Sequence, residues 1–130
     1  MTAVGANVQR SDGEARVRGE AVFGVDLAVA RMLHARLFRA PVAAGLIRRI
    51  DTSAARASDG VHDVVSGADI QNQRAGVAVF DTPLFATDYI AYEGEPIAAV
   101  VADTPELAEA ALRRIEIEID EVAPIATPEQ

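Results

Sequence analysis

The segment IEIEIDEV, Ile115 to Val122, alternates apolar and acidic residues, and it constrains the fold more than any other stretch of the chain. Side chains of a β-strand point alternately to its two faces, so Ile115, Ile117 and Ile119 are expected to face a core. The acidic residues between them are expected to face water, and a calcium-binding patch is the weaker alternative. The pattern therefore predicts a half-buried strand near the C-terminus.

A second strand and a helix are predicted directly before this segment. IAAVVA, Ile97 to Ala102, is continuously apolar, which is typical of a strand covered on both faces. Thr104 is a good N-cap residue, and Pro105 suits the first helical position because its missing N–H needs no partner there. The helix is expected to reach Arg114. Strand, helix and strand with tight joints predict a right-handed crossover unit.

The predicted helix is amphipathic. Glu109 and Arg113 are spaced to pair on its outer side. Its buried stripe is expected to comprise Leu107, Ala108, Ala111 and Leu112.

Shorter elements are predicted upstream. Alternation in Met32 to Phe38 predicts a strand, and the apolar residues of Leu46 to Ile50 predict another. AARASDG is expected to form a short helix that ends at Gly60, and VHDVV a brief strand. Ser66 and Asp69 follow with the spacing of a capping box.

Two parts of the chain show no regular period. Residues 1–30 are broken by glycines and are expected to be irregular, with a turn at Asp12-Gly13. Gln71 to Pro83 is expected to be a loop, and its role stays open. The whole chain, residues 1–130, is expected to form one α+β domain with a mixed sheet and short helices.

Charge and composition exclude several kinds of partner. The chain has a net charge of −8, and its 12 basic residues are all arginines scattered along the sequence, so nucleic acid is not expected to bind. No apolar run approaches the ~20 residues that cross a bilayer. MTAVGANVQRSDGEARVRG lacks the apolar core of a signal peptide. A cytoplasmic protein without a membrane partner is expected.

The residue types of most cofactor sites are missing or isolated. The chain has no cysteine, so it cannot itself hold a disulfide, a cysteine zinc site or an iron–sulfur cluster. His34 and His62 lie singly in predicted strands, which does not predict a metal site. No phosphate-binding glycine motif is present. The sequence therefore assigns no catalytic, cofactor-binding or metal-binding residue.

Glu93 and Glu95 form one candidate acid–base pair. In an extended chain both would point to the same side, ~6–7 Å apart, near the separation used in two-carboxylate hydrolysis. The structural alternative is favoured, because Gly94 permits a bend and Pro96 blocks a ladder hydrogen bond where a strand emerges from a sheet. Both glutamates are then expected at the exposed start of the strand, without a catalytic role.

Three stretches, taken together, resemble one family. QRSDGEARVRGEAVFGVDL is similar to the opening of the large, molybdenum-binding subunit of xanthine dehydrogenases, aldehyde oxidases and aerobic carbon monoxide dehydrogenases. MLHARLFRAPVAAGLIRRIDTSAARASDGVHDVVSGADI and PLFATDYIAYEGEPIAAVVADTPELAEAALRRIEIEIDEVAPI resemble the blocks that follow, the latter including the turn at Gly94, Glu95 and Pro96. The positions that match in the first block are Arg10, Asp12, Gly13, Arg16, Val17 and Gly19.

The resemblance implies an α/β hammerhead fold and a place in a molybdenum-dependent hydroxylase or dehydrogenase. In that family the molybdopterin contacts and the catalytic glutamate belong to longer domains that follow, and Glu93 and Glu95 do not correspond to that glutamate. The [2Fe-2S] clusters and FAD are also carried elsewhere. The main hypothesis is an architectural domain that packs against the molybdopterin-binding domains of an enzyme that also has iron–sulfur and FAD subunits.

Two other hypotheses stay open at this point. One is a free-standing interaction or small-ligand-binding domain of the same fold, and the weaker one is a small carboxylate hydrolase. A domain built to pack on a large partner is expected either to self-associate when alone or to be stabilised by the missing molybdopterin-binding domains. Phe80 lies in a stretch that borders the substrate funnel in related enzymes, but the local match assigns it no role. The sequence does not identify the substrate of the parent enzyme, and it gives no reason for the position of Gln130 as the last residue.

Overall fold

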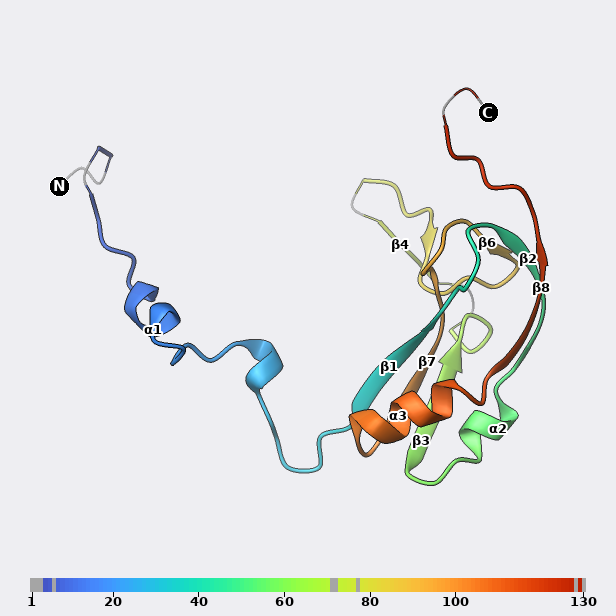
Figure 1. The fold of residues 1–130 in the computed structure, drawn as a ribbon, viewed down its shortest axis with the longest axis horizontal. Helices are drawn as coiled ribbons and strands as arrows, with labels where there is room; N and C mark the ends of the chain where they lie inside the picture. The colour runs from blue at the N-terminus through green and yellow to red at the C-terminus, as the bar shows by residue number, and fades with distance from the viewer. Residues whose placement is uncertain (1–3, 6, 71–72, 77, 128, 130) are drawn as a thin grey trace. The chain divides into compact units, whose positions relative to one another are not determined.

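The chain consists of two compact units, Met1–Ala30 and Arg31–Gln130. The computed structural model describes residues 4–5, 7–70, 73–76, 78–127 and 129. The first unit holds a short helix, α1 (Gly13–Val17), and a 3-10 turn, η1 (Gly24–Asp26), between irregular stretches (Figure 1). The expected irregular segment therefore contains two helical turns.

Asp12 directly precedes α1, where the sequence predicted a simple turn. Its carboxylate accepts hydrogen bonds from the guanidinium groups of Arg10 and Arg16. These two bonds, that of Arg10 first, hold the pKa of the Asp12 carboxyl below its ordinary value. A carboxylate at this end also suits the positive end of a helix.

The second unit contains a three-stranded antiparallel sheet in the order β1-β7-β3. Its strands are β1 (His34–Arg39), β7 (Pro96–Ala102) and β3 (Val61–Ser66). β7, the most apolar segment of the chain, lies in the centre. The strand predictions for Met32 to Phe38, VHDVV and IAAVVA are confirmed to within two residues at each end.

A second antiparallel sheet has the order β6-β2-β8. It consists of β6 (Tyr89–Ile90), β2 (Gly45–Asp51) and β8 (Glu116–Glu121), and the two long strands curve side by side in Figure 1. The acidic residues of β8 are exposed, as predicted. Two of them meet arginines of β2, since Arg48 lies 2.6 Å from Asp120 and Arg49 lies 3.6 Å from Glu118.

The predicted crossover is wrong, although strand, helix and strand follow each other as expected. β7 and β8 belong to different sheets, and every ladder that the described residues form is antiparallel. The cause lies in the isoleucines of β8. Ile119 stands opposite Ile47 and Ile117 opposite Ile50, and such apolar cross-strand pairs stabilise pairing with β2. The periodicity identifies the buried face of β8 but not its partner strand.

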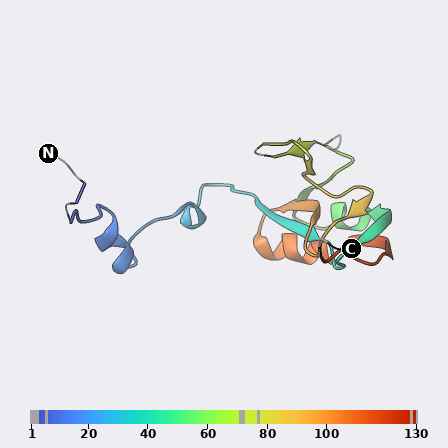
Figure 2. The same ribbon diagram turned by 90° about the horizontal axis from the view of Figure 1, so that it is seen from above.

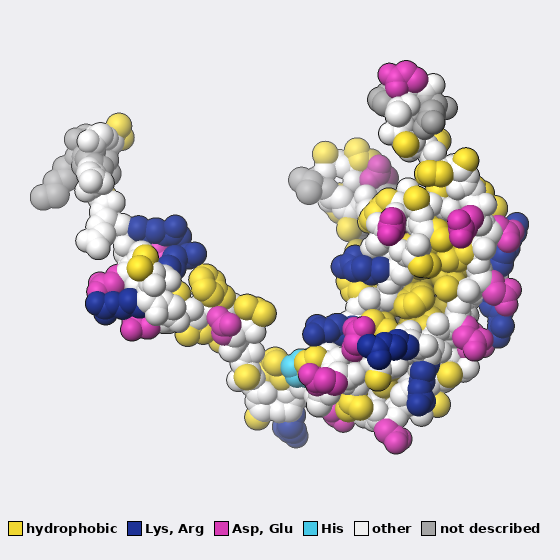
Figure 3. All heavy atoms as spheres, viewed as in Figure 1, with side chains coloured by type: hydrophobic (Ala, Val, Ile, Leu, Met, Phe, Trp, Pro, Cys, Tyr) yellow, Lys and Arg dark blue, Asp and Glu magenta, His cyan; other side chains and the backbone are white. Residues whose placement is uncertain are grey.

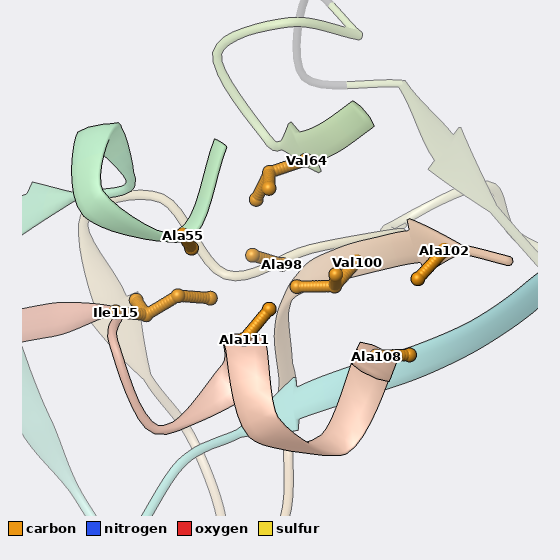
Figure 4. Packing of buried hydrophobic residues seen from close by; sticks show 8 residues of the cluster. All are labelled: Ala55, Val64, Ala98, Val100, Ala102, Ala108, Ala111 and Ile115. Atoms are coloured by element: carbon orange, nitrogen blue, oxygen red, sulfur yellow. The ribbon is translucent and has the colours of Figure 1, made fainter. Parts of the chain in front are cut away.

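One core lies between β7, the helix α3 (Pro105–Leu112) and the short helix α2 (Ser53–Arg56). Alanines supply most of it, so α3 can approach the sheet closely. Figure 4 shows the side chains of this cluster converging from both helices and from β3 and β7. Its buried members are Ala55, Val64, Ala98, Val100, Ala102, Ala108, Ala111 and Ile115.

A second core joins the two sheets. Its buried members are Ala40, Ala86, Ile90 and Ile97. Ile97 belongs to the face of β7 opposite to Val100, and the next residues on that face, Ala99 and Val101, are only half-buried. The prediction that this strand is covered on both faces therefore holds at its Ile97 end alone.

The helix α3 begins as predicted and ends earlier. The Thr104 hydroxyl accepts a hydrogen bond from the Leu107 N–H at 3.2 Å, with Pro105 at the first helical position. The last helical residue is Leu112, so Arg113 and Arg114 lie in the following turn. The predicted pair of Arg113 with Glu109 is present at 3.8 Å. The buried stripe is narrower than predicted, because Leu107 is 36% exposed.

The predicted loop from Gln71 to Pro83 includes residues 71, 72 and 77, which lie outside the described part of the chain. Within it, β4 (Arg74–Ala75) pairs with β5 (Thr82–Pro83) in a small hairpin. Figure 2 shows this hairpin standing out on the side opposite to α3. Two-residue strands are too short to produce a sequence period.

Among the described residues, no helix has the length and apolar character to cross a bilayer.

Candidate interaction surface

Glu93 and Glu95 occupy the turn between β6 and β7, but they do not share an environment. Gly94 between them has a φ of +86°, a conformation that a glycine adopts without strain. The side chain of Glu93 is exposed, as predicted. Glu95 is buried, with only 5% of its surface exposed. The prediction of an exposed Glu95 is wrong, and the two carboxylates do not form a paired site.

The contacts of Glu95 show why it is buried. Its carboxylate Oε2 accepts a hydrogen bond from the Ala91 N–H at 2.6 Å, which closes the turn. Main-chain bonds fasten the same turn to the end of β1: the Ala40 N–H donates to the Glu95 carbonyl at 2.9 Å, and the Gly94 N–H donates to the Ala40 carbonyl at 2.9 Å. The local charge pattern gave no signal of this burial, because the main-chain bonds to Ala40 come from the end of β1, which is distant in the sequence.

The two histidines lie apart, on the two strands that flank β7. His34 is in β1 and His62 in β3. His62 Nε2 lies 2.7 Å from a carboxylate oxygen of Asp103, and both side chains are about half exposed. No group of three or more metal-binding side chains occurs among the described residues. The two histidines therefore do not belong to one metal-binding group.

A polar cluster braces α2 against the end of β3. Arg56 of α2 lies 2.7 Å from Asp63 and 3.4 Å from Asp69. The hydroxyl and the N–H of Ser66 both donate to one oxygen of Asp69 at 2.7 Å, and these bonds lower the pKa of the Asp69 carboxyl. The predicted pairing of Ser66 with Asp69 is confirmed, although a turn follows it and not a helix. The charged side chains of Arg56, Asp63 and Asp69 therefore have a structural role, which is to hold α2 against β3.

Two of the hollows on the surface of the second unit are lined in part by Ser66 and by Glu95, respectively. The larger, of about 390 Å³, lies between β2 and the end of β3, and its walls include Arg48, Arg49, Thr52 and Ser66. Both arginines are already paired with acids of β2 or β8. The smaller, of about 290 Å³, lies beside the β4–β5 hairpin and is bordered by Arg74 and Glu95.

Apolar side chains are left partly uncovered around the second core. Figure 3 shows hydrophobic side chains gathered above α3, between β1 and β8, with charged side chains at their border. Six residues that pack on this core keep part of their surface exposed: Phe38, Val42, Ile47, Ile50, Ile117 and Ile119. A contiguous apolar surface of this kind is a feature of protein contact sites.

The β4–β5 hairpin exposes a second apolar group. Phe80 is 71% exposed and Val79 65% exposed, and Leu84 and Tyr89 are also exposed nearby in the sequence. Aromatic side chains are enriched in the cores of interfaces. Phe80 belongs to neither of the two cores that the described residues form, so its exposure is compatible with a contact outside this chain.

Comparison with known proteins identifies the fold and its family. Residues 18–123 match the aldehyde oxidase and xanthine dehydrogenase a/b hammerhead domain. The chain belongs to this hammerhead domain family. The match agrees with the architectural hypothesis and not with a free-standing binding domain.

Similar proteins include large subunits of molybdenum enzymes. The chain is 37% identical over 128 residues to the nicotinate dehydrogenase large molybdopterin subunit of Eubacterium barkeri, covering 98% of this chain and 30% of that protein. It is 35% identical over 122 residues to a probable xanthine dehydrogenase subunit of Bacillus subtilis, covering 93% of this chain and 16% of that protein. The chain therefore spans less than a third of the length of these relatives.

A solved structure shows the same fold. The aldehyde oxidoreductase of Desulfovibrio desulfuricans superposes with a TM-score of 0.80 at 29% sequence identity, over 89% of this chain and 14% of that one. The hammerhead arrangement of this chain thus occurs as one part of a much longer enzyme.

Proposed function

We propose that this chain is the architectural hammerhead domain of a molybdenum hydroxylase or dehydrogenase, and that it packs against the molybdopterin-binding domains. The family match over residues 18–123 carries the proposal. The uncovered apolar side chains around the second core and on the β4–β5 hairpin support it, because they supply surface for a large partner. Residues 1–130 would serve as one domain with an irregular segment at residues 1–30.

The cofactors are assigned to other parts of the enzyme. Molybdopterin, the [2Fe-2S] clusters and FAD would be held by partner domains and by iron–sulfur and FAD subunits. The lack of cysteine in this chain supports this for the iron–sulfur clusters, whose iron atoms are held by cysteine thiolates. No catalytic residue is assigned to it, and a cytoplasmic location without nucleic-acid contacts follows from the same proposal.

Thermal unfolding tests the packing. The chain would be melted alone and with the molybdopterin-binding domains of its enzyme supplied as a separate polypeptide. A partner that binds only the folded chain raises its melting temperature, and the rise grows with partner concentration. A melting temperature that does not respond to saturating partner would contradict the proposal.

A further inference from the structure

The hollow beside the β4–β5 hairpin, which we call the Glu95 hollow, contains a buried carboxylate with few partners. Its volume of about 290 Å³ is several times the ~30 Å³ share of one water molecule. It is lined by Arg74, Pro83, Thr87, Asp88, Tyr89, Ala91 and Glu95. Unlike the larger hollow, it is bordered by an acidic side chain that is almost fully buried and that pairs with no arginine of the described residues.

The Glu95 carboxylate uses little of its bonding capacity. Within the described part of the chain, one hydrogen bond reaches it, from the Ala91 N–H, and no ion pair does. A carboxylate has about four acceptor positions. Buried charges in proteins are usually paired with an opposite charge or a metal ion, because moving an unpaired charge from water into the protein interior costs free energy. The remaining acceptor positions of Glu95 border the hollow, where a cationic group could reach them.

We propose that the Glu95 hollow binds a cationic side chain of the molybdopterin-binding domains, an arginine that pairs with Glu95. The inference rests on the proposed function and adds a specific contact to it. A guanidinium matches a carboxylate with two parallel hydrogen bonds and also stacks on aromatic rings. Tyr89, which is 45% exposed, supplies such a ring at the hollow, and Asp88 adds a second negative charge.

Other occupants fit the hollow less well. A metal ion would need three or more ligand side chains, and no such group occurs among the described residues. Arg74 also borders the hollow, but its guanidinium donates to the Asp81 carbonyl at 2.6 Å within the hairpin. The two acids and one arginine leave the lining with an excess negative charge, in keeping with the net charge of −8 for the chain.

A binding measurement with three variants tests this pairing. The dissociation constant would be determined for the chain and the molybdopterin-binding domains as separate polypeptides. Glu95→Gln keeps an acceptor for the Ala91 N–H and removes only the charge, so we expect an unchanged melting temperature of the chain alone and an affinity at least about tenfold weaker. Glu93→Gln, an exposed neighbour, is the matched control and is expected to bind as the unchanged chain does. Arg74→Ala is expected to bind no more weakly than Glu93→Gln.

Each of the remaining outcomes contradicts one part of the proposal. If the unchanged chain does not bind, the proposed function fails, and this inference with it. If the unchanged chain binds and Glu95→Gln binds equally well, the arginine pairing is wrong while the proposed function stands. If Arg74→Ala weakens binding as much as Glu95→Gln does, Arg74 of this chain supplies the cation and the inference is overturned.

Discussion

Val100 shows at the scale of one residue how closely the first core is filled. Its side chain has no exposed surface and lies between small residues of β7 and α3 (Figure 4). Interiors of this kind are packed as densely as organic crystals, so there is no room for water beside a new polar group. The alanines Ala108 and Ala111 that face the sheet offer no polar atom in their side chains.

We expect Val100→Asp to threaten folding. An unpaired carboxylate at this site would cost several kcal/mol, against a total stability of about 5–15 kcal/mol for a domain. Urea unfolding followed by circular dichroism would measure it. Val79→Asp is the control, because Val79 is 65% exposed and an exposed substitution changes stability by about 0.5 kcal/mol or less. Equal stability of the two variants would show that β7 is not buried as described.

Asp69 provides a prediction that depends on pH. The Ser66 hydroxyl, followed by the Ser66 N–H, lowers the pKa of the Asp69 carboxyl below its ordinary value of 3.8. The contribution of this carboxylate to stability is therefore fully present above the pKa of the unfolded chain, and it is lost as the pH falls through the lowered pKa of the folded chain.

We expect Ser66→Ala to raise the pKa of Asp69 toward its ordinary value, because the hydroxyl bond is lost and the N–H bond remains. The drop in stability on acidification below about pH 4 should become smaller. A carboxyl titration by NMR would measure the pKa. Ser53→Ala is a matched control, since the Ser53 hydroxyl lowers the pKa of Asp51 and not that of Asp69. An Asp69 pKa that stays constant in Ser66→Ala would contradict the hydrogen-bond assignment.

At the scale of elements, sequence patterns predicted where strands and helices lie far better than they predicted which strands pair with each other. Alternation located β8 and an apolar run located β7, because each pattern depends on the burial of one segment. Sheet membership depends on which partner strand completes the isoleucine pairs, and that information is spread over Ile47, Ile50, Ile117 and Ile119. The burial of Glu95 was not predicted for a similar reason, since the turn that holds it is fastened by main-chain bonds to Ala40 at the end of β1.

The start of α3 offers a test at this scale. Thr104→Ala removes the hydroxyl that accepts the Leu107 N–H, and losing such a cap costs about 1 kcal/mol. Thr104→Ser keeps the hydroxyl and is expected to retain most of the stability. Denaturant unfolding of both variants gives the comparison. Equal losses in Thr104→Ala and Thr104→Ser would mean that the threonine methyl, and not the cap, stabilises the helix.

At the scale of the whole molecule, the described residues form a hammerhead fold with apolar side chains partly uncovered around the second core. The chain spans less than a third of the length of the relatives described above, and those relatives include proteins named as molybdopterin and xanthine dehydrogenase subunits. The sequence resemblance predicted this family. It did not predict which surfaces stay uncovered, because exposure depends on how the two sheets meet around the second core.

Molybdenum content across a size-exclusion profile tests the central claim most directly. The chain, the molybdopterin-binding domains and their mixture would be separated, and the metal in each fraction would be determined by elemental analysis. The architectural account predicts a complex with near one molybdenum per pair of chains, and no stoichiometric molybdenum or iron in the chain alone. Near one molybdenum or iron per isolated chain, or elution of the two polypeptides as separate species at high concentration, would contradict it.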